Sequence, residues 1–378
     1  MLARAMDHDS FATFTGTRHF PALDGLRAAA VLLVVTTHLH SAAWRPLAGR
    51  QGVIAFFVLS GFIITTLLLR EEAMTGRISL RGFYVRRAFR IVPLYALVLA
   101  VYVVAVLALD FEPDKRAGLR HALPYFLTFT NELVIYGDGA RDAIPFYQSW
   151  SLGVEEKFYV LWPLIGFLLL GRVSRLAALF GVTAAACMVQ AVANPNWTRW
   201  YAPILVGCLL AALMHRPDAF ARLQVLGRPG GAAGAVAALV ATHVIHDHDR
   251  GLGELLYPFA VASLLVVLVT GGSPVRGALG SRVAAYVGTR AYGVYLVHIL
   301  VINAIDRVVR PDASLTPRTV LNYLAVAGLS VAVADVLHRT VERPFIALGR
   351  RTSARLGPRT TPGTVAAAAP ADAQPASA

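Results

Sequence analysis

The chain has 378 residues, of which 56% are hydrophobic and 15% are charged, and its mean hydropathy of +0.58 excludes an ordinary soluble domain. The apolar residues form Leu-, Val- and Ala-rich runs that are long enough to cross a bilayer and lack the period-two alternation of a membrane β-barrel. The net charge of +13 would suggest nucleic acid in a soluble protein, but basic loops near anionic lipid explain it here, so we expect no nucleic-acid partner.

The hydropathy pattern predicts an all-α, polytopic integral membrane protein with about ten transmembrane helices. The seventh predicted span is short and rich in small residues, which makes it the weakest prediction of the set. The predicted spans are 23–43, 52–70, 91–109, 152–170, 175–193, 200–214, 232–246, 254–271, 284–304 and 319–338.

Arginine and lysine positions set the expected orientation. If the N-terminus is cytoplasmic, more of these residues fall in the inner loops than in the outer loops, which favours an N-in/C-in arrangement in the cell membrane. We expect a cytoplasmic N-terminal segment over 1–22 without a cleavable signal peptide, a transmembrane domain over 23–345, and a cytoplasmic, disordered tail over 346–378. Two long loops are predicted, an inner one over 71–90 and an outer one over 110–148.

The first predicted span carries ionisable groups. Arg27 and His38 are eleven positions apart, about three helical turns, so they share nearly the same face and lie roughly 16 Å apart along the axis. Asp24, one turn before Arg27, lies on that face and can neutralise it. A charge inside a membrane helix is costly and normally faces a protein interior or a watery cavity. We therefore interpret these residues as functional, rather than as a structural ion pair with a satisfied histidine.

Three arginines, Arg86, Arg87 and Arg90, lie at the inner end of the third predicted span. Arg87 and Arg90 are three positions apart and are therefore neighbours on one helix face. A guanidinium group binds phosphate through two parallel hydrogen bonds, so the cluster suits a phosphorylated ligand. These residues alone support a second explanation equally well, in which the arginines set the membrane topology and contact lipid headgroups.

Two adjacent glutamates, Glu155 and Glu156, lie near the start of the fourth predicted span, and Tyr159 follows one turn later. The helix dipole favours acidic residues there, which is a sufficient structural explanation. The functional alternative is that one glutamate faces a cavity and orients a histidine or a sugar hydroxyl. The sequence does not choose between the two glutamates.

Single polar groups also occur in two other spans. His298 falls in the outer half of the ninth span with Tyr295 one turn below it, and hydrogen-bonded packing explains this pair slightly better than function does. Ser60 and Gly61 lie in the middle of the second span, where close helix packing explains them most simply. The polar groups thus divide into an arginine-rich inner layer and an outer layer of histidine and glutamate.

Taken in order, these motifs resemble a known family. The matching stretches are Leu23-Asp24-Gly25-Leu26-Arg27 with His38, Phe57-Val58-Leu59-Ser60-Gly61-Phe62, Arg86-Arg87-Ala88-Phe89-Arg90-Ile91-Val92-Pro93, Trp150-Ser151-Leu152-Gly153-Val154-Glu155-Glu156-Lys157-Phe158-Tyr159, Tyr292-Gly293-Val294-Tyr295-Leu296-Val297-His298 and Glu342-Arg343-Pro344-Phe345. The chain is similar to the membrane acyltransferase-3 family of O-acyltransferases, from about Leu23 to Phe345. Each motif alone is weak, whereas their common order on this hydropathy profile is specific.

The resemblance implies transfer of an acyl group from cytoplasmic acyl-CoA, often acetyl-CoA, to a hydroxyl of a carbohydrate-type acceptor such as a surface polysaccharide or glycolipid. Some relatives instead acylate macrolide-like metabolites. The essential Arg and His of the family correspond to Arg27 and His38, and its Arg-x-x-Arg motif corresponds to Arg87 and Arg90. Some relatives carry an SGNH hydrolase-like domain after the last span, and the short stretch after the tenth span here leads us to expect none.

Two hypotheses from different classes follow. In the first, the protein is an acyl-CoA:hydroxyl O-acyltransferase, because a hydroxyl that attacks a thioester must lose a proton and histidine suits that task. In the second, Asp24, Arg27, His38 and Glu156 form the relay of a proton-coupled carrier, which leaves the cytoplasmic arginines unexplained. We favour the enzyme.

The enzyme hypothesis assigns a role to each residue. We expect acyl-CoA as donor substrate, and neither a permanently bound cofactor nor a metal site. The expected roles are base for His38, orienter for Glu155 or Glu156, donor anchor or thioester polariser for Arg27, CoA-phosphate binding for Arg86, Arg87 and Arg90, and support from Asp24, Ser60, Tyr159, Tyr295 and His298.

Overall fold

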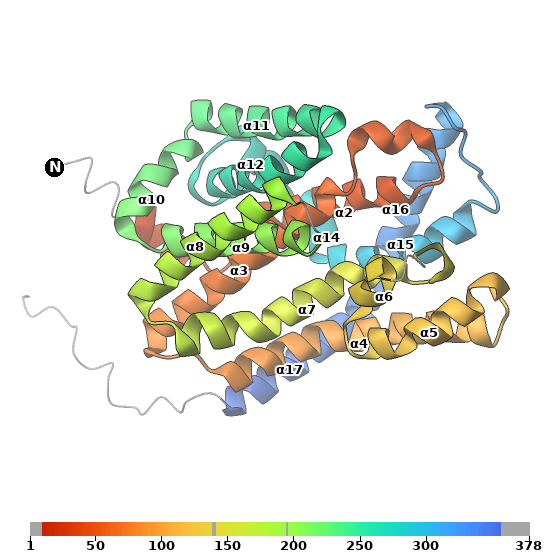
Figure 1. Cartoon of the computed structure of the whole chain (residues 1–378), viewed down its shortest axis with the longest axis horizontal. Coiled ribbons are helices and arrows are strands. Elements are labelled where there is room, and N and C mark those ends of the chain that lie inside the picture. Colours follow the sequence, from red (N-terminus) through yellow and green to blue (C-terminus); the bar gives the residue numbers. More distant parts are fainter. Residues whose placement is uncertain (1–9, 138–140, 194–195, 357–378) are drawn as a thin grey trace, which may run out of the picture.

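The computed structural model describes residues 10–137, 141–193 and 196–356, and regular structure in these ranges is helical, without a strand (Figure 1). The expected all-α fold is confirmed. The longer helices are α2 (Pro21–His38), α3 (Gln51–Thr75), α4 (Leu80–Leu107), α5 (Arg116–Leu127), α6 (Asn131–Gly137), α7 (Trp150–Pro163), α8 (Arg172–Val192), α9 (Asn196–Met214), α10 (Pro217–Leu223), α11 (Pro229–His248), α12 (Arg250–Thr270), α13 (Pro274–Leu279), α14 (Arg282–Thr289), α15 (Ala291–Ile305), α16 (Pro317–Leu337) and α17 (Arg343–Leu356).

Six helices in the described residues are long and apolar enough to cross a membrane, and nine spans result if each of three bent helix pairs counts as one. The bent pairs are Ser10–Gly16 with α2, α9 with the segment Pro217–Gly227, and α14 with α15. The predicted span without such a counterpart, 152–170, coincides with α7 and the π-helical stretch Leu164–Leu169 that continues it. The protein is thus a multi-span membrane protein, and the count of ten stays a prediction.

The prediction of a long loop over 71–90 is wrong. Only residues 76–79 separate α3 from α4. Gly76, with a φ of 74°, ends α3 in the left-handed conformation that glycine adopts without strain, and the Ser79 hydroxyl caps α4 by accepting a hydrogen bond from Gly82 N at 3.2 Å. Both helices therefore continue past their apolar runs, because capping residues rather than hydropathy end them.

The C-terminal boundary expected at residue 345 falls inside helix α17. Phe345 packs against Phe89 of α4, with ring centroids 6.4 Å apart, and α17 continues along α4 (Figure 1). Residues 346–356 are consequently helical, whereas the rest of the expected tail lies outside the described residues. The predicted outer loop over 110–148 likewise contains helices α5 and α6.

Glycines bring pairs of helices into backbone contact at the centre of the bundle. A Cβ atom added to Gly61 of α3 would lie 2.0 Å from the carbonyl oxygen of Ile204 in α9, so the close packing expected at Gly61 is confirmed. A Cβ atom on Gly288 of α14 would lie 1.8 Å from the carbonyl oxygen of Asp24 in α2. Helix α2 is therefore fixed against α14 at the level of its charged residues.

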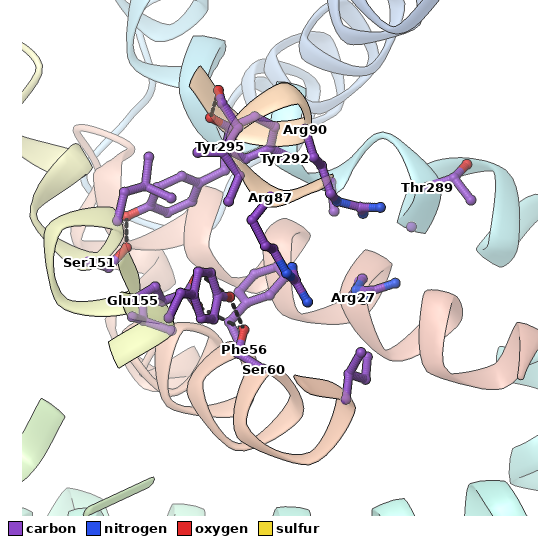
Figure 2. A pocket seen from close by; sticks show the side chains of 17 residues that line it. Arg27, Phe56, Ser60, Arg87, Arg90, Ser151, Glu155, Thr289, Tyr292 and Tyr295 are labelled. Atoms are coloured by element: carbon purple, nitrogen blue, oxygen red, sulfur yellow. Dashed lines mark hydrogen bonds between the residues drawn. The ribbon is translucent and has the colours of Figure 1, made fainter. Parts of the chain in front are cut away.

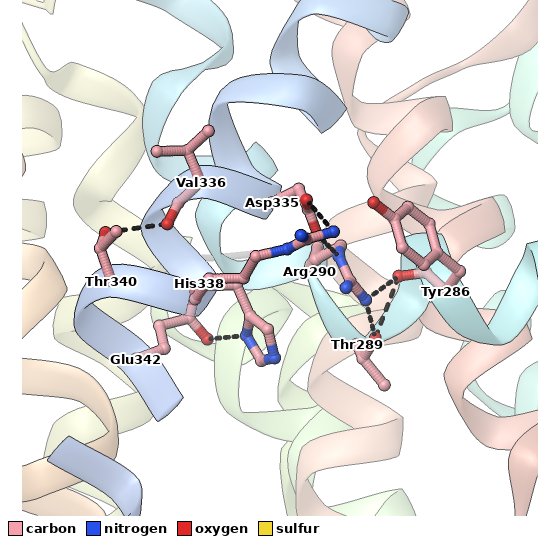
Figure 3. A network of polar contacts seen from close by, with 9 residues as sticks. Tyr286, Thr289, Arg290, Asp335, Val336, His338, Thr340 and Glu342 are labelled. Atoms are coloured by element: carbon pink, nitrogen blue, oxygen red, sulfur yellow. Dashed lines mark hydrogen bonds and ion pairs between the residues drawn. The ribbon is translucent and has the colours of Figure 1, made fainter. Parts of the chain in front are cut away.

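The bend between α14 and α15, which measures 70°, is held by a polar network around Arg290 (Figure 3). Arg290 Nε donates to Asp335 Oδ1 of α16 at 2.6 Å, and its Nη1 donates to the Tyr286 carbonyl oxygen at 3.0 Å. The second oxygen of Asp335 lies 2.7 Å from Nη2 of Arg339. By tying the bend to α16, this network positions Thr289 beside the first of the two pockets described below.

Candidate active site

Helix α2 carries an ion pair near its start and a histidine as its last residue. Arg27 Nη1 lies 2.6 Å from Asp24 Oδ1, and His19 Nε2 lies 2.6 Å from Asp24 Oδ2. Asp24 is buried, with 3% of its surface exposed, so its charge depends on these partners. The expected pairing of Asp24 with Arg27 is confirmed, and the pair leaves much of the Arg27 guanidinium available to a pocket beside it.

We call that pocket the arginine pocket. It is lined by residues of α2, α3, α4, α7, α14 and α15, among them Arg27, Ser60, Arg87, Arg90, Glu155 and Thr289. Figure 2 shows the side chains of the three arginines directed into it. Within the described residues neither Arg87 nor Arg90 forms an ion pair, and Arg87 stacks on Tyr159 with its guanidinium carbon 4.9 Å from the ring centroid. Unpaired cations in a cavity provide an anion site.

Arg86 differs from the other two arginines of its motif. Its Nη2 lies 3.0 Å from Oε2 of Glu71, and it does not line the arginine pocket. Glu71 also accepts a hydrogen bond from Ser79 N at 2.8 Å, so this contact ties the end of α3 to the start of α4. The structure therefore places Arg87 and Arg90 together at the pocket and directs Arg86 elsewhere.

Glu155 of α7 forms a compact hydrogen-bonded cluster inside the arginine pocket (Figure 2). Its Oε1 accepts a hydrogen bond from Ser60 Oγ at 3.0 Å, and its Oε2 lies 3.1 Å from the Tyr159 hydroxyl. Glu156 does not line this pocket, and its Oε1 is buried without a hydrogen-bond partner in the described part of the chain. The glutamate that faces the cavity is thus Glu155, and Ser60 contributes a hydrogen bond as well as a small side chain.

The two histidines that the sequence left separate are in contact. His298 of α15, which is fully buried, has its Nε2 3.2 Å from Nδ1 of His38. Its Nδ1 lies 2.7 Å from the carbonyl oxygen of Tyr295. A carbonyl oxygen only accepts, so Nδ1 of neutral His298 carries the hydrogen and its Nε2 is an acceptor. His38 Nδ1 must then be the donor, which leaves the lone pair of neutral His38 on Nε2.

Tyr295 connects the histidine pair to α7. Its hydroxyl lies 2.7 Å from Ser151 Oγ and also donates to the carbonyl oxygen of Gln148. The Tyr295 side chain is buried, and these bonds fix the turn of α15 that contains it. The carbonyl oxygen of Tyr295 in this turn accepts the hydrogen bond from His298 Nδ1. Tyr295 therefore holds the position of His298, and through it that of His38.

A second pocket lies at the His38 end of α2, and we call it the histidine pocket. Its lining includes Phe57 and a cluster of three further aromatic rings, with centroid separations of 5.0 Å between Tyr136 and Trp200 and 5.3 Å between Trp150 and each of these two. An ion pair of Arg199 Nε with Glu254 Oε2, 2.8 Å apart, lies in the same wall. Sequence reasoning missed Trp200 and this ion pair, because nothing near them in the chain distinguishes them from ordinary span residues.

Val53 of α3 lines both pockets, so a single side chain separates them at this point.

Among the described residues no group of three or more His, Cys, Asp and Glu side chains is placed to hold a metal ion.

The profile of the acyltransferase domain family, Acyl_transf_3, matches residues 20–339. The chain belongs to this family. It is 30% identical over 367 residues to "Putative peptidoglycan O-acetyltransferase YrhL" of Bacillus subtilis, with 89% of this chain and 56% of the relative covered. It is 27% identical over 363 residues to "Peptidoglycan O-acetyltransferase OatA" of Listeria monocytogenes, with 87% and 56% covered. No solved structure matches the chain.

The chain spans less than two thirds of the length of those relatives. The family assignment made from the sequence motifs is confirmed, and the chain carries the acyltransferase domain of this family. The family match contains both pockets, because α2, α3, α4, α7 and α15 all lie within residues 20–339.

Proposed function

We propose that this protein is an O-acetyltransferase that moves an acetyl group from acyl-CoA to a hydroxyl of a carbohydrate acceptor such as a surface polysaccharide or glycolipid. The observation that carries the proposal is a pair of pockets along one helix: one holds Arg87 and Arg90, which form no ion pair within the described residues, and the other holds a histidine that can act as a base. The relatives named as O-acetyltransferases of peptidoglycan support both the acetyl group and the carbohydrate.

The distance between the pockets suits a donor with a long flexible arm. Coenzyme A has its phosphates at one end and its thioester at the other. If Arg87 and Arg90 bind the phosphates, the acyl group must reach His38, which lies roughly 16 Å from Arg27 along α2. Arg27 and His38 are thus too far apart to act on one carbonyl group. Of the two roles expected for Arg27, donor anchoring fits this geometry and thioester polarisation does not.

The chemical step follows from the hydrogen bonds of the histidine pair. His38 Nε2 takes the proton of the acceptor hydroxyl as its oxygen attacks the thioester carbonyl carbon. The carbon–sulfur bond then breaks, and the CoA thiolate takes that proton from His38, which returns the imidazole to its neutral form. His298 Nε2 and the Val34 carbonyl oxygen, 3.2 Å and 3.1 Å from His38 Nδ1, both accept its hydrogen and keep the ring in the tautomer that this step needs. We assign the positioning of His38 to His298, while Glu155 orders Ser60 and Tyr159.

A direct assay tests the proposal. Protein reconstituted in phosphatidylcholine liposomes would be given acetyl-CoA with soluble glycans or, separately, with a macrolide as a non-carbohydrate acceptor. We expect CoA release and acetylated glycan from the wild-type protein and neither from His38→Gln, with mass spectrometry of the acceptor as the readout. CoA release that needs the macrolide and never occurs with a glycan would contradict the proposed acceptor class.

We also propose the N-in/C-in orientation in a cell membrane, with the arginine pocket open to the cytoplasm. The test replaces Cys187 by Ser, introduces Cys at position 87 or at exposed Ala313, and applies a membrane-impermeant thiol reagent to cells. Position 313 should react in intact cells and position 87 only after permeabilisation. Reaction of position 87 from outside would overturn the scheme in which the donor comes from the cytoplasm.

A further inference from the structure

A third and wider cavity, of about 570 Å³, lies next to the histidine pocket, and we call it the vestibule. Its walls come from the end of α2, the 3₁₀ turn Ala42–Leu47, α11 and α12. The vestibule and the histidine pocket share Thr37, Gly49, Arg50 and Glu254, so the two spaces are adjacent. A molecule in the vestibule therefore lies next to the pocket that His38, Trp150 and Trp200 line.

The vestibule carries an excess of positive charge. Arg45, Arg50 and Arg250 line it, all three are exposed, and in the described part of the chain none of their guanidinium groups forms an ion pair. Of the two acids in its walls, Glu254 is paired with Arg199, and Asp247 is the other. Cavities lined by one sign of charge concentrate ligands of the opposite sign, and arginine forks match a carboxylate in two parallel hydrogen bonds.

Arg50 is the residue that links this charge to the reaction. It lines both the vestibule and the histidine pocket, so an anion bound to it lies at the boundary between the two spaces. We propose that the vestibule binds a carboxylate of the acceptor, which makes the acceptor an acidic glycan whose reacting hydroxyl enters the histidine pocket. The aromatic rings of Tyr136, Trp150 and Trp200 offer apolar faces to the C–H face of the sugar beside it. This inference rests on the proposed function and specifies its acceptor.

The test uses acceptors that differ in charge alone. Wild-type protein, Arg50→Gln and Arg45→Gln, each in phosphatidylcholine liposomes, would be assayed with uronic-acid-containing oligosaccharides and with the same oligosaccharides converted to carboxamides. For the wild-type protein the acceptor KM should be tenfold or more lower for the acid than for the carboxamide, because a charge-assisted hydrogen bond is lost in the second. Arg50→Gln should remove most of this preference and leave the KM for acetyl-CoA unchanged.

The control is Arg318→Gln, which removes an exposed arginine that lines none of the three cavities. It should leave the acid preference as it is in the wild-type protein. Because Arg45 and Arg50 are exposed and unpaired within the described residues, their substitution should not impair folding, and size-exclusion chromatography would verify this.

Three outcomes would count against the vestibule proposal. Equal KM values for acid and carboxamide, or a preference for the neutral form, would overturn it while leaving the proposed function intact. An effect of Arg50→Gln that occurs only when phosphatidylglycerol is added to the liposomes would assign the arginines to an anionic lipid headgroup instead. A complete lack of CoA release with every glycan would, by contrast, refute the proposed function itself.

Discussion

The arginine pocket and the histidine pocket border α2 at two levels, at Arg27 and at His38, and differ in their chemistry. The first holds Arg87 and Arg90, which lack ion pairs in the described residues, next to a carboxylate bound by Ser60 and Tyr159. The second holds His38, whose contact with His298 is ordered by the backbone carbonyl groups of Val34 and Tyr295, beside stacked aromatic rings. The difference suggests that charge recognition and proton transfer occur at separate places along α2, with Arg27 and His38 roughly 16 Å apart on its axis, so that substitutions in one pocket should leave the function of the other unchanged.

The largest effect should come from His38. His38→Ala and His38→Gln should both lower kcat by about 10²–10⁴-fold, because glutamine can keep a hydrogen bond but cannot accept the hydroxyl proton. CoA release measured against pH should rise in the wild-type protein as the histidine becomes neutral, since only the neutral ring is a base. Acetyl-CoA binding, measured by isothermal titration, should be unchanged in both variants. Near-normal turnover of His38→Gln would remove His38 from the mechanism and make it a packing residue.

Substitutions in the arginine pocket should have an intermediate effect, and this effect should appear in the KM for acetyl-CoA rather than in kcat. The double substitution Arg87→Ala with Arg90→Ala should raise the KM for acetyl-CoA by about a hundredfold or more, since each of the two lost charge-assisted bonds is worth about 1.5–3 kcal/mol. The acceptor KM should change little. Lysine at both positions should restore part of the affinity for acetyl-CoA, because it returns the positive charge but not the planar guanidinium group that binds phosphate through two hydrogen bonds.

Arg86→Ala is the matched control for that experiment. Arg86 belongs to the same motif but binds Glu71 and does not line the pocket, so its loss should leave the KM for acetyl-CoA nearly unchanged. If substitution of Arg86, Arg87 and Arg90 had the same effect on the KM for acetyl-CoA, the motif would set the membrane topology and would not bind the donor.

The smallest of the three effects should come from His298. His298→Leu removes one of the two acceptors near the His38 Nδ1 hydrogen and leaves the Val34 carbonyl oxygen at 3.1 Å, so we expect kcat to fall about tenfold at most, in line with the loss of one positioning hydrogen bond. His298→Gln can supply an amide oxygen at a similar place and should recover much of the activity. Both variants should keep the wild-type KM for acetyl-CoA. If leucine and glutamine gave equal losses with equal thermal stability, the contact between the histidines would have no part in catalysis.

The sequence was most informative where partners lie on one helix or in one motif. The spacing of Asp24 and Arg27 predicted their ion pair, and the spacing of Glu155 and Tyr159 brought these residues within one turn. The family was identifiable because its motifs occur in a fixed order along the chain. In all these cases the relevant interaction is local, and helical periodicity determines it.

Contacts between distant segments were not predictable in this way. His38 and His298 are 260 positions apart, and no periodic pattern connects them, so the sequence favoured packing for His298. Sequence patterns also gave no reason to expect that Arg86 would turn away from Arg87 and Arg90, since its direction depends on Glu71 at the end of another helix. The loop predicted over 71–90 was wrong because hydropathy detects the apolar part of a helix and not its polar extensions.

The central position of α2 has a consequence for how the protein is made. Helices α14 and α15, which contact α2 at Gly288 and His298, leave the ribosome some 260 residues after it. During that interval the charge of Arg27 is already balanced by Asp24 on the same helix, which lowers the cost of holding α2 in lipid. The arginine pocket is not complete before α14 and α15 have been inserted, and His38 has no histidine partner until then. A nascent or truncated chain that ends before α15 therefore lacks part of the arginine pocket and the contact that positions His38.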